Sequence, residues 1–307
     1  MSAITTVATN DNQVPAIKDI DPSFYPESAS STHSSAGDSL GSSISSSTSS
    51  ISLPTMGSQS RPEAVVPPRI TARAYIAGNL KTGKIYEQYN SAKSLPVASM
   101  SKLITALAYL NEFPLSARIT ITPEEMTAPP DGSMLQAGES FSFGEIIYPL
   151  LLNSSNVAAE ALASSTDRTK FLKTMSSYAW EIGMSSTYFA DPSGVDPHNK
   201  ASAKDLFTLA LYLTKYRPDL LALTQTPKFT IATTTQHGSH TFTSTHPFIN
   251  DPNFLGGKTG RTPAAGETML TIIRIKNQPV AIIVLGSEYG TREKDTRMIM
   301  EDVASFL

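Results

Sequence analysis

Three short motifs of chemically reactive residues follow one another along this 307-residue chain. They are Ser-Met-Ser-Lys at 99–102, Ser-Ser-Asn at 154–156 and Lys-Thr-Gly at 258–260. A serine hydroxyl is a weak nucleophile until a base removes its proton. A lysine can be that base when burial or nearby positive charge lowers its pKa toward neutrality. The first motif therefore predicts a nucleophilic serine beside its own base.

The spacing of Ser99 and Lys102 suits one face of a helix, because residues three apart lie about one turn from each other. Apolar residues at helical spacing follow directly over residues 100–110 and predict that helix. Backbone N–H groups at a helix start can also stabilise developing negative charge. Without the other two motifs, the same pattern would be read as a helix cap and a solvated lysine.

Ser154 and Asn156 fall between two predicted helices, over residues 144–152 and 156–163. Side chains two apart in such a break can point into one cleft. There the hydroxyl can relay a proton to a leaving group and the amide can hold a substrate carbonyl. The same letters also form a good helix cap, so this motif gains weight only from its neighbours.

Lys258 would supply positive charge for a substrate carboxylate, and Thr259 a hydroxyl beside it. Gly260 would allow a substrate backbone to approach closely along a strand. A second Lys-Thr-Gly, at 81–83, is interpreted as a hairpin turn.

Strands are predicted at both ends of the folded part and helices between them. The strand patterns form three hairpins, over residues 72–89, 228–244 and 268–286, the last with its connection at 276–279. Further amphipathic helices are predicted over residues 169–182, 203–214 and 293–306. This order favours an α+β domain whose terminal strands join one antiparallel sheet.

Composition divides the chain near Pro68. Between Ser28 and Ser52, 14 of the 25 residues are serine, and prolines and glycines follow. Such a segment cannot bury enough apolar surface to offset its ordering entropy. We therefore predict a disordered segment and linker at 1–68 and a single catalytic domain at 69–307.

Charge and composition exclude several classes of protein. The net charge of −3 without a basic block argues against nucleic-acid binding, and the absence of cysteine excludes disulfides and thiol catalysis. The longest strongly apolar run, at 280–285, is too short to span a bilayer, and no signal peptide is recognisable at the start.

Together these residues resemble the serine-type D-Ala-D-Ala carboxypeptidases, the low-molecular-weight penicillin-binding proteins, over roughly residues 70–307. Stretches outside the three motifs share the resemblance. Residues 95–102 (LPVASMSK) are similar to the family's LPIASLTK, 189–196 (FADPSGVD) to FVNPTGLD, 150–162 to LLLPSGNDAANAL and 258–266 to KTGYTDAAG. The resemblance implies a β-lactamase/transpeptidase-like fold with a helical subdomain.

The resemblance also implies roles for individual residues. Ser99 would be the acylated nucleophile, Lys102 its base and Ser154 the proton shuttle, with an oxyanion hole from the backbone N–H groups of Ser99 and Arg261. The substrate-binding residues would be Asn156, Lys258, Thr259, Gly260 and Arg261. The enzyme would release the terminal D-alanine of a peptidoglycan stem peptide, need no cofactor or metal, and be inhibited covalently by β-lactams. It would work outside the cytoplasm, in the periplasm or at the cell wall, held by a tether preceding the linker.

Two departures from the family pattern stand out. Ser155 replaces the usual glycine and Val157 a frequent aspartate, which raises the question of the loop's geometry. The chain also ends soon after its last predicted helix, before the additional β-domain and anchor of many relatives.

Four alternatives remain. A D,D-endopeptidase that cuts cross-links would use the same residues. A class A β-lactamase would need a glutamate in a deacylation loop, whereas Glu160 and Glu181 fall within helical patterns. A metal-dependent peptidase would need clustered ligands, but His237 and His240 fall in a predicted hairpin turn. A catalytically silent cell-wall-binding protein is disfavoured because every motif position keeps its functional group.

Overall fold

The computed structural model describes residues 70–307, and a five-stranded sheet is the frame of this part of the chain. Neighbouring strands are antiparallel in the order β2-β1-β11-β10-β9. Their bounds are β1 Ala74–Asn79, β2 Ile85–Tyr89, β9 Phe254–Thr262, β10 Gly266–Ile275 and β11 Gln278–Ser287. Strands from both ends of the described chain thus share one antiparallel sheet, and the α+β prediction is confirmed. The predicted disordered segment and linker at 1–68 lie outside the described residues.

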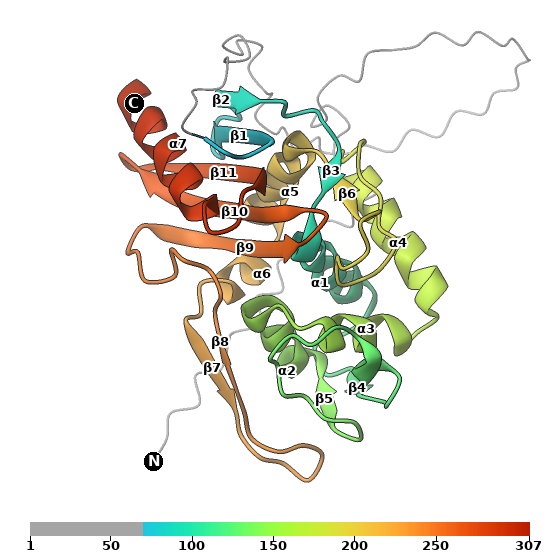
Figure 1. Ribbon diagram of the computed structural model, residues 1–307. Coiled ribbons are helices and arrows are strands. Elements are labelled where there is room, and N and C mark those ends of the chain that lie inside the picture. Colours follow the sequence, from blue (N-terminus) through green and yellow to red (C-terminus); the bar gives the residue numbers. More distant parts are fainter. Residues whose placement is uncertain (1–69) are drawn as a thin grey trace, which may run out of the picture.

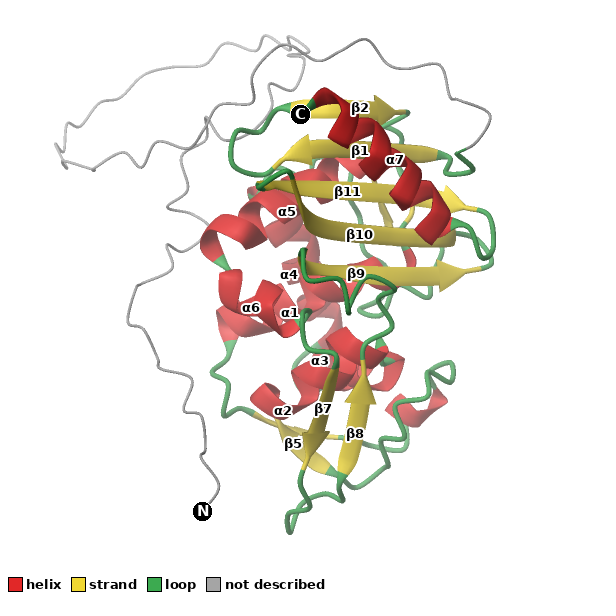
Figure 2. Cartoon of the chain, turned by 90° about the vertical axis from the view of Figure 1, so that its left-hand side faces the viewer, coloured by secondary structure: helices red, strands yellow, loops and turns green. Residues whose placement is uncertain are grey.

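Helices cover both faces of this sheet, which explains the nearly continuous apolar sequence of its central strands. Helix α7 (Arg292–Phe306) lies across one face and α5 (Ala203–Tyr216) lies on the other (Figure 2). Successive side chains of a strand point to opposite faces. Accordingly, Tyr75 of β1 belongs to the cluster that includes Ile299 of α7, whereas Ile76 belongs to the larger cluster on the α5 side.

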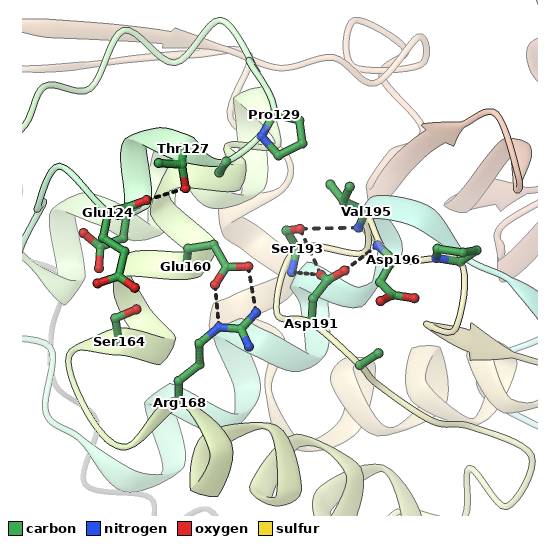
Figure 3. A pocket seen from close by; sticks show the side chains of 14 residues that line it. Glu124, Thr127, Pro129, Glu160, Ser164, Arg168, Asp191, Ser193, Val195 and Asp196 are labelled. Carbon is green, nitrogen blue, oxygen red and sulfur yellow. Dashed lines mark hydrogen bonds and ion pairs between the residues drawn. The ribbon is translucent and has the colours of Figure 1, made fainter.

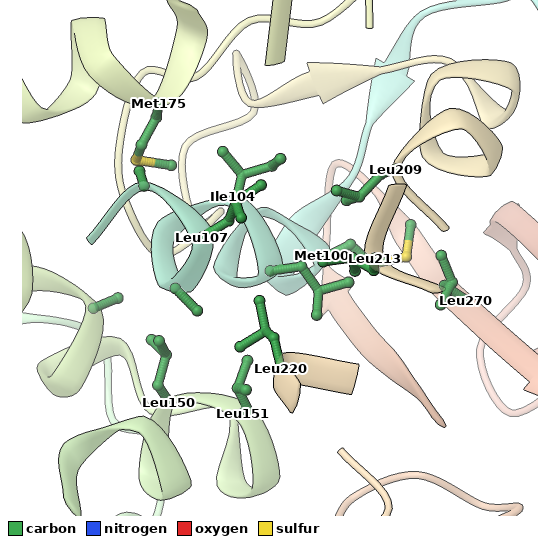
Figure 4. Packing of buried hydrophobic residues seen from close by; sticks show 14 of the residues in the cluster. Met100, Ile104, Leu107, Leu150, Leu151, Met175, Leu209, Leu213, Leu220 and Leu270 are labelled. Carbon is green, nitrogen blue, oxygen red and sulfur yellow. The ribbon is translucent and has the colours of Figure 1, made fainter. Parts of the chain in front are cut away.

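The larger cluster surrounds α1 (Ser101–Glu112), the helix that follows the first motif. Figure 4 shows Ile104 and Leu107 in its middle, with Met175 on one side and Leu213 on the other. The remaining α-helices are α2 Phe143–Tyr148, α3 Asn156–Ser164, α4 Arg168–Glu181 and α6 Pro218–Leu223. Shorter turns of helix are η3 Ala98–Met100, η4 Glu125–Thr127 and the π-helix η5 Pro149–Asn153. Because α1 is buried on nearly all sides, the residues at its start are held rigidly.

Three two-stranded sheets lie outside the main one. They pair β3 (Leu95–Pro96) with β6 (Lys200–Ala201), β4 (Arg118–Thr120) with β5 (Ser140–Ser142), and β7 (Lys228–Ile231) with β8 (His240–Thr243). The β7–β8 hairpin extends from the sheet region past α2 (Figure 1). The backbone N–H groups of Thr243 and Thr245 donate to Asn153 Oδ1 (3.0 Å) and Leu152 O (3.1 Å). The hairpin is therefore attached to the segment that leads into the second motif.

All three predicted hairpins are present, and the second Lys-Thr-Gly is a turn as predicted, with Gly83 at φ 71°. The connection predicted at 276–279 is shorter than expected. Only Lys276 and Asn277 form it, both in the left-handed region, and β11 already begins at Gln278. A two-residue turn of this kind matches the twist of the strands it joins.

Candidate active site

Ser99 lies in η3, directly before α1, and its side chain is within hydrogen-bonding distance of the lysine of its own motif. Nζ of Lys102 donates to Oγ of Ser99 at 2.9 Å. The residue before the serine, Ala98, has φ 50°, a left-handed conformation that is uncommon for a residue with a Cβ. Gly194 packs so closely here that a Cβ on it would lie 1.9 Å from Ala98 O. The strained turn that presents Ser99 is thus held from outside by a second loop.

Lys102 is fully buried, and each of its three N–H groups has an acceptor. Besides Ser99 Oγ, these are Asn156 Oδ1 at 2.8 Å and the backbone oxygen of Ser193 at 2.7 Å. Burial lowers the pKa of Lys102 to about 7, against the opposing effect of nearby carboxylates, Asp191 foremost. The neutral amine can still donate to Asn156 and Ser193 while its lone pair faces Ser99. The geometry thus suits a base for the Ser99 proton.

The second motif follows the π-helix η5, whose last residue is Asn153. Ser154 then adopts a left-handed conformation, with φ 65°, and α3 begins at Asn156. The unusual Ser155 is the N-cap of α3, since its Oγ accepts the N–H of Ala158 at 3.0 Å. Val157 is buried in the core. Both departures from the family pattern therefore have a local structural role at the start of α3.

The third motif lies on strand β9, in agreement with the strand expected for Gly260. Lys258 is 2% exposed, and its Nζ donates to Ser154 Oγ at 2.8 Å and to Thr259 O at 2.9 Å. Burial lowers the pKa of Lys258 well below its ordinary value, and the charges of Lys102 and Arg292 lower it further. The second and third motifs, 104 residues apart, thus share a hydrogen bond.

Gly260 is the point where the sheet comes closest to the nucleophile. A Cβ at this position would lie 2.9 Å from the backbone N of Ser99 and 2.5 Å from Oγ1 of Thr268. Thr268, on the neighbouring strand, also donates to Val97 O at 3.0 Å, just before the first motif. Only glycine fits here without displacing the start of α1.

Thr259 and Arg261 flank Gly260 and differ in their surroundings. The Thr259 hydroxyl is buried and lies 2.8 Å from the hydroxyl of Thr245. The Arg261 side chain is exposed, and its guanidinium lies 5.9 Å from the ring centre of Tyr289. The cluster of motif residues therefore consists of two hydrogen-bonded groups. Lys102 binds Ser99 and Asn156, and Lys258 binds Ser154. Gly260 packs against Ser99, while the Arg261 side chain is exposed.

Three residues that the sequence reading did not select also contact the motifs. Asp131 binds the start of α3, Ser193 supplies its carbonyl to Lys102, and Arg292 donates from Nη1 to Gly260 O at 2.9 Å. Ser193 lies in the 189–196 stretch already noted for its resemblance, so a signal was present. Asp131 and Arg292 carry no such local pattern, because each acts on a motif far away in sequence.

A cavity of about 640 Å³ adjoins this cluster. Figure 3 shows Pro129 and Ser193 on its wall, with the Glu160–Arg168 ion pair (2.8 Å) across from them. The carbonyls of Pro129 and Ser193 accept from Asn156 Nδ2 and Lys102 Nζ. Two residues on the wall of the cavity are therefore hydrogen-bonded to Lys102 and Asn156.

Two further features concern metals and membranes. Among residues 70–307, no group of three or more His, Asp or Glu side chains is placed to hold a metal ion. His240 instead lies 2.7 Å from Glu139, next to the hairpin turn. Within the same residues, no helix combines the length and apolar character needed to cross a bilayer.

Sequence comparison places these motifs in a known family. The family model described as D-alanyl-D-alanine carboxypeptidase matches residues 61–289, most of the chain. The chain belongs to the D-alanyl-D-alanine carboxypeptidase family. Its members are hydrolases of the cell wall, and the fold and the resemblance predicted from sequence are confirmed.

Individual relatives carry two different names within this family. The chain is 31% identical to a D-alanyl-D-alanine endopeptidase of Pseudomonas aeruginosa over 248 residues, which are 77% of this chain and 79% of that protein. It is 25% identical to D-alanyl-D-alanine carboxypeptidase DacA of Haemophilus influenzae over 250 residues, 77% of this chain and 63% of that protein. The crystal structure of a D-alanyl-D-alanine carboxypeptidase from Mycobacterium tuberculosis H37Rv superposes with a TM-score of 0.71 at 22% identity, over 80% of this chain and 95% of that one. This last likeness shows the shared fold.

Proposed function

We propose that this protein is a serine D,D-carboxypeptidase that removes the terminal D-alanine from peptidoglycan stem peptides through an acyl-enzyme on Ser99. One observation carries the proposal. Oγ of Ser99 lies 2.9 Å from Nζ of Lys102, a fully buried amine whose pKa burial lowers to about 7. A nucleophile in contact with a base that is largely neutral near physiological pH is the requirement for acylation without a metal or cofactor.

In the acylation step, neutral Lys102 takes the proton of Ser99 while Oγ attacks the carbonyl carbon of the penultimate D-alanine. The oxyanion that forms would accept from the backbone N–H groups of Ser99 and Arg261. When the peptide C–N bond breaks, the proton that Lys102 received passes through Ser154 to the departing amine, and Lys102 is neutral again. Lys258 lies 2.8 Å from the Ser154 hydroxyl and can keep it oriented for that transfer. D-alanine leaves, and an ester on Ser99 remains.

Substrate binding would use β9, which is the outer strand of the sheet on its side. An extended peptide can pair with such a strand through backbone hydrogen bonds. Lys258 and Thr259 would receive the terminal carboxylate, and Gly260 would let the peptide approach closely. Asn156 uses Oδ1 for Lys102 and one N–H for Pro129 O, so its second N–H is the group available for a substrate carbonyl.

Water then attacks the ester, Lys102 taking the proton and Ser99 recovering it. A β-lactam would acylate the same serine and, where hydrolysis is slow, stay attached. The first test is the intact mass of the protein after incubation with benzylpenicillin, with Ser99→Ala and Lys102→Ala alongside. We expect one penicilloyl group on the wild type and none on either variant.

Each other outcome of this test has a definite meaning. Full labelling of Ser99→Ala would refute the assignment of the nucleophile. No adduct with rapid destruction of the drug would indicate a β-lactamase. Neither adduct nor turnover would indicate a catalytically silent wall-binding protein.

An endopeptidase that cuts cross-links is the second candidate, and one observation favours it. The relative named an endopeptidase is 31% identical to this chain, whereas the relative named carboxypeptidase DacA is 25% identical. Both activities use the same acylation step and differ in the leaving group. Incubation with a pentapeptide monomer and a cross-linked dimer, followed by chromatography, separates them. Release of D-alanine supports the carboxypeptidase, and conversion of dimer to monomer supports the endopeptidase.

Such a substrate lies in the cell wall, so the protein would act outside the cytoplasm. We infer that residues 69–307 form the catalytic domain and that the serine-rich segment at 1–68 is not part of it.

A further inference from the structure

The loop between η4 and β5 contacts the start of α3 through one carboxylate, that of Asp131. Its Oδ2 accepts from Oγ of Ser155 at 2.9 Å, from the backbone N of Val157 at 3.1 Å, and from the backbone N of Asn156. The other oxygen accepts from the backbone N of Ser133 at 2.8 Å within its own loop. Asp131 thus satisfies N–H groups of the first turn of α3, which have no partner within the helix.

The same loop also determines the orientation of the Asn156 amide. The carbonyl of Pro129 accepts from Nδ2 of Asn156 at 3.0 Å, on the side opposite Lys102. Because Nδ2 donates to Pro129, Oδ1 faces the Lys102 ammonium at 2.8 Å. A reversed amide would bring two donors together at Lys102 and two acceptors together at Pro129. The loop therefore holds Asn156 by its backbone and by its side chain.

We propose that Asp131 is a positioning residue for acylation, acting through Ser155 and the first turn of α3 to hold Asn156 against Lys102. The proposal rests on the proposed function in one respect, that Ser99 is the residue acylated. The link depends on Ser155, the residue that replaces the usual glycine. A glycine has no hydroxyl to donate to Asp131, so this chain has a contact that the common motif cannot make.

The charge of Asp131 acts on Lys102 as well. Burial raises the pKa of Asp131, but hydrogen bonds from Ser133, Val157 and Ser155 lower it more, so this carboxyl is ionised at neutral pH. The charged groups facing Lys102 from the surrounding elements are Asp191, Asp131, Glu160 and Lys258. The Asp131 carboxylate favours the protonated form of Lys102. Its removal therefore lowers the pKa of Lys102, and so does the loss of Asn156 Oδ1 as an acceptor for the ammonium.

The test compares Asp131→Asn and Ser155→Ala with a matched control, Asp167→Asn. Asp167 is also a helix cap, accepting from the backbone N of Lys170 at 3.0 Å, but it serves α4. We measure the second-order rate constant for labelling by a fluorescent penicillin from acid to alkaline pH, and thermal unfolding of each variant.

Asp131→Asn should slow labelling by about tenfold, the usual effect of one hydrogen bond to a charged group, and move the acid limb of the pH profile to lower pH. Ser155→Ala should slow labelling less, and the double variant should be no slower than Asp131→Asn alone, since both act through one contact. Asp167→Asn should keep nearly the wild-type thermal stability, because asparagine caps a helix about as well as aspartate, and it should label at the wild-type rate.

A second readout does not depend on catalysis. With ¹³Cε-labelled lysine, NMR titration follows Lys102 directly, and Lys102→Arg assigns its signal. The midpoint should fall in Asp131→Asn and stay unchanged in Asp167→Asn. A wild-type labelling rate together with a wild-type Lys102 midpoint in Asp131→Asn would overturn the inference. If the wild type is not labelled at Ser99, the proposed function fails, while the titration still decides whether Asp131 controls the surroundings of Lys102.

Discussion

Lowering the pH from 8 to 6 should slow acylation of Ser99 by a β-lactam by about an order of magnitude, because acylation needs the neutral form of Lys102. Burial lowers the pKa of this amine to about 7, with the carboxylates of Asp191, Asp131 and Glu160 opposing the shift. The site lies in a fully buried position, so the charged form has no water to solvate it. The titration therefore falls within the physiological range, where an exposed lysine does not titrate.

The size of the effect follows from that value. With a pKa of about 7, roughly nine-tenths of Lys102 is neutral at pH 8 and roughly one-tenth at pH 6. The rate constant should therefore fall about tenfold over this interval and tenfold more for each further pH unit. A ligand with a carboxylate should bind more weakly as the pH rises and Lys258, whose pKa is also lowered by burial, loses its charge.

The assay is rapid-quench labelling with a fluorescent penicillin under second-order conditions, with far-ultraviolet circular dichroism at each pH to show that the protein stays folded. Ser99→Ala gives the background. A flat profile between pH 5.5 and 8.5, or a rate that falls as the pH rises from 6 to 8, would refute the role of Lys102 as the base.

Three further substitutions test the surroundings of the site. Gly260→Ala should slow labelling by about a hundredfold, because its Cβ would lie 2.9 Å from the backbone N of Ser99 and displace the nucleophile; wild-type kinetics would contradict this. Arg292→Leu removes the donor to Gly260 O and should slow labelling by about tenfold. The control Arg297→Leu, on the exposed side of the same helix, should label at the wild-type rate. Equal rates for the two variants would show that the Arg292–Gly260 hydrogen bond does not matter for acylation. Glu139→Gln should lower the free energy of unfolding, measured by urea titration, by about 1 kcal/mol. It should also speed hydrogen exchange at the tip of the β7–β8 hairpin, where Glu139 accepts from Gly238 N and contacts His240. Unchanged exchange would show that this carboxylate does not hold the hairpin.

Much of the secondary structure could be predicted from local patterns. The helix after the first motif was predicted over residues 100–110 and α1 spans Ser101–Glu112, since its apolar spacing is a property of the helix itself. The short helix α6 and the small sheets β3–β6 and β4–β5 were not predicted. A strand of two or three residues is too short to show the alternation of polar and apolar side chains by which strands are recognised, and its partner strand lies far away in sequence.

The features of the site likewise separate into those that local sequence sets and those that the fold sets. The sequence by itself determined that Ser99 and Lys102 face each other, because residues three apart near a helix start are neighbours whatever the rest of the chain does. It also identified the other motif residues by type and by resemblance, and their roles in catalysis stay predictions.

Only the tertiary structure decided what surrounds them. Asn156 and Ser193 bind Lys102 from two separate segments, and Asp131 acts on it from a third through its charge. The pairing of β9 with β10 helps to place Gly260 beside Ser99. Burial lowers the pKa of Lys102 only once these segments have closed around it. Desolvation is a property of the whole packed arrangement, and for that reason no motif encodes it.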